Sequence, residues 1–471
     1  MSSARPVQVA RSRNLLPWVA LLLGGCAAGP DYHRPALSAS PAALQAFSED
    51  GAWRAAAPAA VQDHAPWWQP YGDAGLDALL QQVNDANQTL QAAAAQYRQA
   101  DALARATRAT LWPQLDLGAE AERARTHTAA GTQVGDTRAV TAQASWEPDL
   151  WGRLRRSLEA AGATARASQA DLSAVRLEVQ AAAVDDYIEL RLDDSLHDLF
   201  VRTIDAYQRS LQIAEAQLRT GVATMADVSL ARNTLAAARA QAVDVDLARS
   251  QTEHALAVLA GKVPADFRLA AAPLQLQPQP APAALPSTLL ERRPDIAAAE
   301  QRVIAANAGI GIARAAWFPD LDLTASRGES VVGSFAAAPA AVWALGAALA
   351  GTLFDGGARR AQNAAARAAF DVAAADYRQT VLAGFQDVED NLAALRELAQ
   401  ERNYAEQALQ AARESQDVLL RQYQSGTANY LAVIQAQALA LGSERSALQL
   451  RARELAAGVA LIKALGGAAT E

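Results

Sequence analysis

The sequence contains a single cysteine, Cys26, among its 471 residues, so no disulfide can form within one chain. After this cysteine it has no apolar run of the ~20 residues that a transmembrane helix requires. Its five histidines are scattered, without metal-ligand spacing and without a nucleophile as partner. The formal net charge is −8, which argues against a nucleic-acid partner, since such a partner would call for a clustered basic face. We therefore predict no enzyme activity, no metal, no cofactor and no nucleic-acid partner.

The N-terminus has the pattern of an export signal. Three arginines precede an apolar stretch at residues 15–23, which is too short to span a bilayer. Leu23-Gly24-Gly25-Cys26 resembles the bacterial lipobox, and Ala27 after it resembles lipoproteins sent to the outer membrane. We expect residues 1–25 to be removed and Cys26 to be acylated; a buried structural thiol is the alternative. This interpretation places the chain at the periplasmic leaflet of a Gram-negative outer membrane.

The chain is an internal duplication with a period of about 205 residues. Residues 112–117 match 318–323, residues 184–188 match 388–392, and both copies close on glycine. A proline-rich connector, which cannot be helical, separates the copies. The expected organisation is a signal peptide at 1–25, a lipidated segment at 26–75, a first repeat at 76–262, the connector at 263–293, a second repeat at 294–467 and a tail at 468–471.

Each repeat predicts the same order of elements. A helix at 76–111 or 294–316 ends at a proline and is followed by two strands. A helix of about 67 residues comes next, at 153–219 or 358–424, and would be about 100 Å long. Such a rod must pack along its length, and residues 381–399 have the apolar spacing of a coiled-coil seam. A shorter helix then returns to the closing glycine.

The strands are identified by alternation of apolar and polar residues. The pattern occurs near 115–122, 140–147, 321–326 and 343–353 and is typical of transmembrane barrel strands; an ordinary half-buried sheet is the alternative. Aromatic residues favour the barrel, because they lie where strands meet helices, at one level, as in a membrane-interface girdle. These are Trp112, Trp151, Trp317, Phe318 and Phe354, and Trp343 is expected in the opposite girdle.

Four strands cannot close a barrel, and open edges are not tolerated in lipid, so several chains must contribute. Two chains would give 8 strands and three would give 12. The polar strand faces hold acidic residues that would form negative rings in a lumen and favour cations; a solvated face without selectivity is the alternative. These residues are Asp116, Glu120, Glu122, Glu147 and Asp322.

The chain resembles a known family. Residues 67–73, Leu289 to Ile296 and the tip at 423–427, together with the duplication and the lipobox, are similar to the outer-membrane factors of tripartite efflux systems. The similarity points to their NodT-type lipoprotein branch, TolC- and OprM-like. It implies a mixed, mostly α fold: a homotrimer with a 12-stranded barrel in the outer membrane and a long periplasmic α-helical barrel. It also implies a passive duct for small amphiphiles, with a periplasmic adaptor and an inner-membrane pump as partners.

The resemblance further implies a gate at the helix tips after Gly221 and Gly426. An aspartate of the family bonds to the second hairpin and holds the tube shut, and Asp227 and Tyr423 match these positions. Asn429, beside Tyr430, falls where OprM-like members have an acidic residue. Ala428 replaces an arginine partner, and Ala432 and Gln435 replace a pore-lining aspartate ring. We expect fewer ionic locks and weaker cation block.

The resemblance places adaptor contacts at the two turns themselves. The expected contact residues are Arg219, Gly221, Val222, Ala223, Gly426 and Thr427. A competing interpretation of the long helices is a periplasmic adaptor or a structural coiled-coil lipoprotein. An adaptor normally has one helical hairpin between halves of a small β-domain, whereas this chain has two hairpin units that alternate with paired amphipathic strands.

Overall fold

The computed structural model describes residues 28–36, 66–129, 131–277, 292–332 and 338–467. These residues fall into two compact units, each assembled from segments far apart in the sequence. Among the described residues, unit 1 draws on 28–36 and on the described parts of Gln96–Ser168 and Ala298–Tyr377, and unit 2 on 66–95, the described part of Gln169–Ala297, and 378–467. The predicted signal peptide, Cys26, the C-terminal tail and part of the connector lie outside the described residues.

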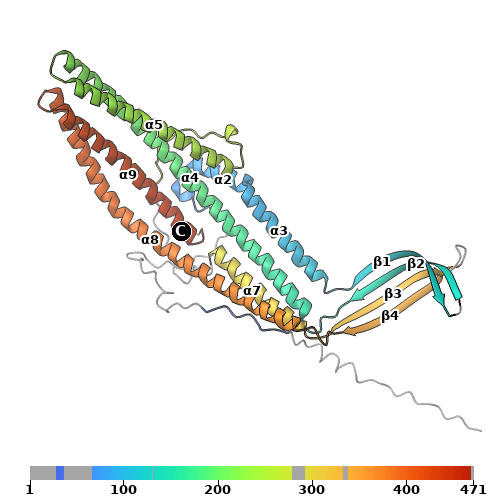
Figure 1. Ribbon diagram of the computed structural model, residues 1–471. Helices are drawn as coiled ribbons and strands as arrows, with labels where there is room; N and C mark the ends of the chain where they lie inside the picture. The colour runs from blue at the N-terminus through green and yellow to red at the C-terminus, as the bar shows by residue number, and fades with distance from the viewer. Residues whose placement is uncertain (1–27, 37–65, 130, 278–291, 333–337, 468–471) are drawn as a thin grey trace, which may run out of the picture. The chain divides into compact units, whose positions relative to one another are not determined.

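Two pairs of helices repeat with equal lengths (Figure 1). The long ones are α4 (Arg153–Arg219) and α8 (Ala358–Gln424), with 67 residues each, and the shorter ones are α5 (Met225–Leu259) and α9 (Tyr430–Ala464), with 35 each. The long helices have the predicted bounds, because a glycine shortly after each one favours a turn. In the part of the chain that is described, no helix is both long and apolar enough to cross a membrane.

The predicted seam of α8 is buried within unit 2. Val388 and Leu392 are both at most 5% exposed and pack against Leu461 and Leu465 at the end of α9. Phe385, one turn before Val388, covers the same cluster. The apolar spacing read from the sequence therefore marks the face on which α8 and α9 pack.

The helix predicted at 76–111 is wrong in one respect, because the structure has two helices there, α2 (Ala74–Ala86) and α3 (Gln88–Ala109). Asn87 separates them with extended backbone. Its Oδ1 accepts the Leu90 N–H at 3.0 Å, and its Nδ2 donates to the carbonyl of Leu259 at 2.9 Å. The side chain thus caps α3 and at the same time holds the last residue of α5, so tertiary contact determines the break.

The second repeat has a joint at the corresponding place, before α7 (Pro294–Ala315). Arg293 Nη1 donates to the carbonyl of Ala464, the last residue of α9, at 3.1 Å. The same guanidinium pairs with Asp295 at 2.7 Å and with Asp387 at 3.1 Å. Both repeats therefore fasten the end of the returning helix to the residue just before a helix, α3 in the first repeat and α7 in the second, once through a neutral amide and once through a charged group.

Glycine is required at these joints. Gly261 after α5 has φ +68°, and Gly466 after α9 has φ +86°. A Cβ on either residue would collide with a backbone carbonyl, of Ala86 in the first case and of Arg292 in the second. The closing glycines found in the sequence thus allow a close approach of two backbones as well as a left-handed turn.

The four strands form one curled antiparallel sheet in unit 1, in the order β1-β2-β3-β4. They are β1 (Gln114–Thr128), β2 (Gly131–Trp146), β3 (Asp320–Val332) and β4 (Ala340–Ala350). The pairing of β2 with β3 joins the two repeats within one chain. Each outer strand, β1 and β4, has one neighbour among the described residues of the chain.

The register confirms the alternation of faces. Leu117 lies opposite Ala142, and Leu115 lies opposite Ala144, so their side chains share one face. Leu323 of β3 lies opposite Trp146 and Ala347, which extends the same apolar face across the sheet. The acidic residues of β1 and Asp322 of β3 lie on the other face.

β1 and β2 are longer than the predicted segments, which ended near residue 122 and began near residue 140. The hydrogen-bonded ladder continues beyond the apolar part, to Thr128 opposite Gly131. Arg123 and Asp136 lie opposite each other there and form an ion pair of 3.4 Å. Alternating hydrophobicity therefore identified the apolar section of the strands and missed their charged continuation.

The core of unit 2 surrounds the middle of α4. Tyr187 is 1% exposed and its hydroxyl donates to Asp73, the N-cap of α2, at 3.0 Å. Trp67 is also buried and donates to Gln180 at 3.1 Å. The described part of the connector lies against the same helix, since the Leu274 N–H donates to Ser195 Oγ at 2.8 Å. The connector is thus packed along α4 here.

Candidate functional site

The first helix tip is the turn from α4 into α5. Gly221 has φ +78°, and the Val222 N–H donates to the Gln217 carbonyl at 2.9 Å. This pair closes α4 in the manner of a Schellman motif. Thr224 then caps α5: the Asp227 N–H donates to its Oγ1 at 3.3 Å, and its own N–H donates to Asp227 Oδ2 at 2.8 Å. The first tip is therefore fixed by a glycine and a capping box.

The second tip, from α8 into α9, has the same backbone. Gly426 has φ +77°, and the Thr427 N–H donates to the Gln422 carbonyl at 2.8 Å. Asn429 is the N-cap of α9 and accepts the Ala432 N–H at 2.9 Å. No carboxylate takes part in this cap, in contrast to the first tip.

The residues predicted to contact an adaptor lie at these turns. Val222 is 69% exposed, and Arg219, Gly221, Gly426 and Thr427 are also exposed. Ala223 is the exception, because it is half-buried. A Cβ on either turn glycine would meet no atom within 4 Å, so the backbone conformation alone requires glycine there.

A buried tyrosine cluster lies behind the tips. Tyr423 and Tyr430 are 5% and 4% exposed, and their ring centroids are 5.2 Å apart. Ala231 of α5 and Val433 of α9 complete the cluster. Burial is the main cause that raises the pKa of both tyrosines, and the nearby charge of Asp227 acts in the same direction. Both hydroxyls are therefore neutral donors at any physiological pH.

The hydroxyl of Tyr423 is buried and has no hydrogen-bond partner within the described chain. The structure gives no hydrogen bond between it and Asp227, whose Oδ2 instead accepts from Thr224. Tyr207 of α4 is buried in an adjoining cluster with Leu235 and Ala238 of α5, and Leu211 packs against both clusters. Tyr207 was not among the residues predicted for the gate, because it lies 12 residues before the end of α4, about three helical turns from the tip.

The aromatic residues predicted at a membrane interface lie at the helix–strand junctions of unit 1. Trp151 stacks on Phe318 with centroids 4.7 Å apart, and its Nε1 donates to the Pro319 carbonyl at 2.8 Å. Trp112 and Phe354 are 70% and 88% exposed. Because the strands are antiparallel, the first residues of β1 and β3 and the last residues of β2 and β4 lie at the same end of the sheet.

Two aromatic residues have other surroundings. Trp317 lies under the guanidinium of Arg359, 5.1 Å from its ring centroid. Trp343 lies near the start of β4, towards the opposite end of the strands, and is 74% exposed. Trp146, which was predicted as a strand residue and not as an interface aromatic, donates from Nε1 to the Leu111 carbonyl at 3.1 Å. This bond ties the end of β2 to the residues before β1.

The acidic residues predicted to line a lumen separate into two groups. Asp116, Glu120 and Glu122 of β1 share a face, and the strand register puts Asp322 on the same side. Glu147 lies beyond the end of β2 and accepts from Arg153 at 2.6 Å. Its charge is therefore compensated inside the chain, whereas the others remain exposed.

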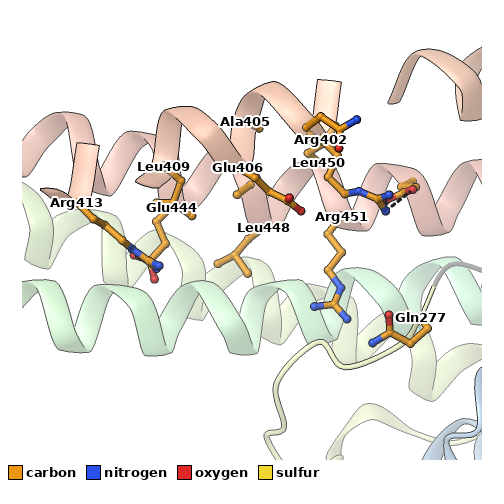
Figure 2. A pocket seen from close by; sticks show the side chains of 13 residues that line it. Gln277, Arg402, Ala405, Glu406, Leu409, Arg413, Glu444, Leu448, Leu450 and Arg451 are labelled. Atoms are coloured by element: carbon orange, nitrogen blue, oxygen red, sulfur yellow. Dashed lines mark hydrogen bonds and ion pairs between the residues drawn. The ribbon is translucent and has the colours of Figure 1, made fainter. Parts of the chain in front are cut away.

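A groove of about 520 Å³ lies between α8 and α9 in unit 2 (Figure 2). Its charged side chains are largely paired: Arg402 lies 2.8 Å from Glu454, and Arg413 lies 2.8 Å from Glu444. Arg451 donates to a backbone carbonyl at 3.0 Å. These guanidinium groups already have acceptors, so the groove offers little excess charge to a ligand.

A curled sheet whose outer strands each have one neighbour in the described part of the chain, joined along the chain to paired helices that turn at glycine tips, defines a protomer of an outer-membrane channel. The chain belongs to the outer membrane efflux protein family, because a sequence profile of that family matches residues 79–262 and 285–467. The first matched stretch ends at residue 262, and the second starts within the predicted connector and ends at residue 467.

Named relatives agree with this assignment. The chain is 31% identical to the toluene efflux pump outer membrane protein TtgC of Pseudomonas putida, over 95% of this chain and 94% of the relative. It is 30% identical to the pyoverdine export outer membrane protein OpmQ of Pseudomonas aeruginosa, over 95% of each. The solved outer-membrane channel OprN superposes with a TM-score of 0.85 at 27% identity, over 94% of this chain and 99% of that one.

The chain is therefore an outer membrane efflux protein with a β-barrel part and a large periplasmic helical part. Members of this family are efflux channels rather than enzymes. The alternative of a periplasmic adaptor or a structural coiled-coil lipoprotein has no support among these relatives.

Proposed function

We propose that three copies of this chain form the exit duct of a tripartite efflux system. The observation that supports this most directly is that the outer strands, β1 and β4, each have a neighbour on one side alone among the described residues. Strand edges exposed to lipid are not viable, so β4 of one copy must pair with β1 of the next. Channels of this family are trimers, and three sheets of four strands make a 12-stranded barrel.

The transported compounds are small amphiphiles. Two relatives are named for toluene and for pyoverdine, which are chemically unlike, so a wide duct with little selectivity is the common property. A periplasmic adaptor and an inner-membrane pump are the partners, since the relatives are components of pumps. Transport through this chain is passive and involves no catalysis.

The chain is anchored and oriented at the outer membrane by three features. Cleavage after residue 25 frees Cys26 for acylation, and the aromatic residues at the helix–strand junctions lie at the lipid interface. The apolar sheet face, with Leu115, Leu117 and Leu345 all exposed in a single chain, contacts lipid. The opposite face then lines the lumen, where Asp116, Glu120, Glu122 and Asp322 form negative rings that favour cations.

The gate lies at the tyrosine cluster behind the helix tips. The buried hydroxyl of Tyr423 lacks an acceptor among the residues that the structure describes, which is costly for a buried donor. In the closed trimer this hydroxyl is bonded, and Asp227, with Asn429 and Tyr430 on the second hairpin, belongs to the same lock. The exposed turns at 219–223 and 426–427 dock the adaptor.

Single-channel conductance in planar bilayers tests both the duct and the gate. Asp227→Ala and Tyr423→Phe raise a small, mostly closed conductance. Two controls separate the lock from local stability: Thr224→Ala removes the capping interaction but keeps the carboxylate, and Tyr404→Phe alters an exposed tyrosine of α8. Neither control opens the channel.

The outcomes are distinct. A protein that inserts no channel in any form overturns the duct. Channels whose conductance is the same in the wild type and in all four variants leave the duct in place and overturn the gate. If Thr224→Ala raises the conductance as strongly as Asp227→Ala does, Asp227 acts through helix capping and is not part of the lock.

A further inference from the structure

A basic cavity lies where α7 ends and α8 begins in unit 1. Its volume is about 430 Å³, within the range of roughly 300–1,000 Å³ for small-ligand sites. Six residues line it: Arg314, Trp317, Arg360, Asn363, Ala364 and Arg367. Three of the six are arginines and none is acidic, so the cavity has a concentrated positive charge.

The three arginines have no recorded acceptor among the described residues, in contrast to the arginines of the groove in Figure 2. Arg359 beside them is different: its Nε donates to Asp355 at 2.6 Å, and its guanidinium covers Trp317. Asp355 also accepts the N–H groups of Gly357 and Arg359. This carboxylate is thus occupied in capping α8 and in holding Arg359, and Arg359 in turn positions the tryptophan.

The position of Arg360 is unfavourable without an anion. It lies in the first turn of α8, and that turn holds no acidic residue. The positive end of the helix dipole repels a cation in the first turn. An anion in the cavity would be attracted by this dipole and by the guanidinium groups together.

The first repeat lacks this arrangement. At the period of the duplication, Leu111 stands in place of Trp317 and Gly162 in place of Arg367. Arg155, the counterpart of Arg360, is paired with Asp149 at 3.1 Å. The uncompensated charge is therefore a property of the second repeat and not of the shared backbone.

We propose that this cavity binds the phosphate of an anionic phospholipid headgroup of the outer membrane. The inference rests on the proposed function, since it requires the sheet of unit 1 to lie in that membrane. Leu353 and Phe354, between β4 and α8, are 100% and 88% exposed and provide an apolar surface for acyl chains. Trp317 at the cavity supplies the amphipathic ring that is common at headgroup level. A soluble anion would gain nothing from these apolar side chains.

Native mass spectrometry of the purified full-length trimer with added phosphatidylglycerol or phosphatidylcholine tests the proposal. The wild type retains phosphatidylglycerol in preference to phosphatidylcholine. The triple variant Arg314→Gln, Arg360→Gln and Arg367→Gln weakens phosphatidylglycerol binding on the order of a hundredfold, and Arg367→Gln alone weakens it by about fivefold. The reason is that each basic group near an anionic lipid contributes a similar share of the binding free energy. The single variant alters an exposed side chain and preserves the fold.

The matched control removes three exposed arginines that line none of the described cavities, by Arg98→Gln, Arg239→Gln and Arg445→Gln. Equal lipid retention in the wild type and in the cavity variants overturns the proposal, as does an equal loss in the control. Conductance of the same preparations is the separate measurement. A wild type that forms no channel counts against the proposed function, whereas conducting variants with unchanged lipid binding count against this inference alone.

Discussion

Replacing Gly221 by alanine isolates the role of the first tip turn. The residue has φ +78°, and a Cβ there would touch nothing within 4 Å. The substitution therefore introduces backbone strain without a steric clash. The left-handed conformation costs an alanine about 1–2 kcal/mol. Because tip amides exchange through local opening, this cost corresponds to an exchange rate about 5- to 30-fold faster around residues 217–228.

Gly442→Ala provides the matched control. Gly442 lies inside α9 with ordinary helical backbone, and a Cβ there also touches nothing within 4 Å. An alanine in a helix interior is more stable than a glycine by roughly 0.5–1 kcal/mol, so exchange around residue 442 slows by about two- to fivefold. Glycine-to-alanine substitution thus lowers the local stability at position 221 and raises it at position 442.

Hydrogen exchange followed by mass spectrometry on the intact trimer measures both effects. Gly426→Ala, whose φ is +77°, repeats the result of Gly221→Ala at the second tip. Slower or unchanged exchange at the tip in Gly221→Ala would refute the reasoning, because it would mean that the turn does not depend on the left-handed residue. A loss of protection throughout the helices would show instead that the turn is coupled to global unfolding.

Three further predictions concern single side chains. Asn87→Ala lowers the free energy of unfolding by about 1–2 kcal/mol, measured by denaturant titration against Gln88→Ala, because one cap and one bond to the Leu259 carbonyl are lost. Burial, with the charges of two neighbouring carboxylates, raises the pKa of Asp193 to about 7. Between about pH 4 and 7 the folded state therefore binds more protons at this residue than the unfolded state, and the free energy of unfolding falls as the pH rises from about 4 to 7. Asp193→Asn flattens this dependence in thermal unfolding at pH 5 and pH 8, and an unchanged slope would contradict it. Trp151→Phe keeps the stacking on Phe318 but loses the bond to the Pro319 carbonyl, and costs about 1 kcal/mol in the same titration, whereas no change would mean that solvent replaces that bond.

The ends of the long helices were predictable because their signals are local. Gly221 and Gly426 adopt the left-handed conformation that the sequence position implied, and α4 and α8 end two residues before them. The break at Asn87 was not predictable from the helical pattern around it. Its stability depends on the carbonyl of Leu259, 172 residues away, and only the preference of asparagine for helix N-caps marked the position.

The sheet shows a similar division between local and distant causes. Alternation located the apolar sections of the strands, but it carried the fourth strand to Leu353, whereas β4 ends at Ala350. It also missed the continuation of β1 and β2 through Arg123 and Asp136, where the apolar alternation stops. The pairing of β2 with β3 depends on the order of strands in space, which no local pattern contains. The tyrosine cluster likewise joins residues of α4, α5, α8 and α9, so periodicity within one helix could not identify it.

The two repeats use different side chains to stabilise the same two backbone features, the end of the returning helix and the cap at the tip. The returning helix is fastened by neutral Asn87 in one copy and by charged Arg293 in the other. The tip cap uses a carboxylate at Asp227 but an amide at Asn429. The long and the returning helices have equal lengths in the two repeats, and the two tips have the same backbone conformation. The backbone of the tips therefore gives a partner no basis for binding one repeat in preference to the other. A preference of the adaptor for one tip must then come from side chains that differ between the tips. These include Thr224 and Asp227 of the first cap and the exposed turn residues Val222 and Thr427, and exchanging them with their counterparts would transfer the preference.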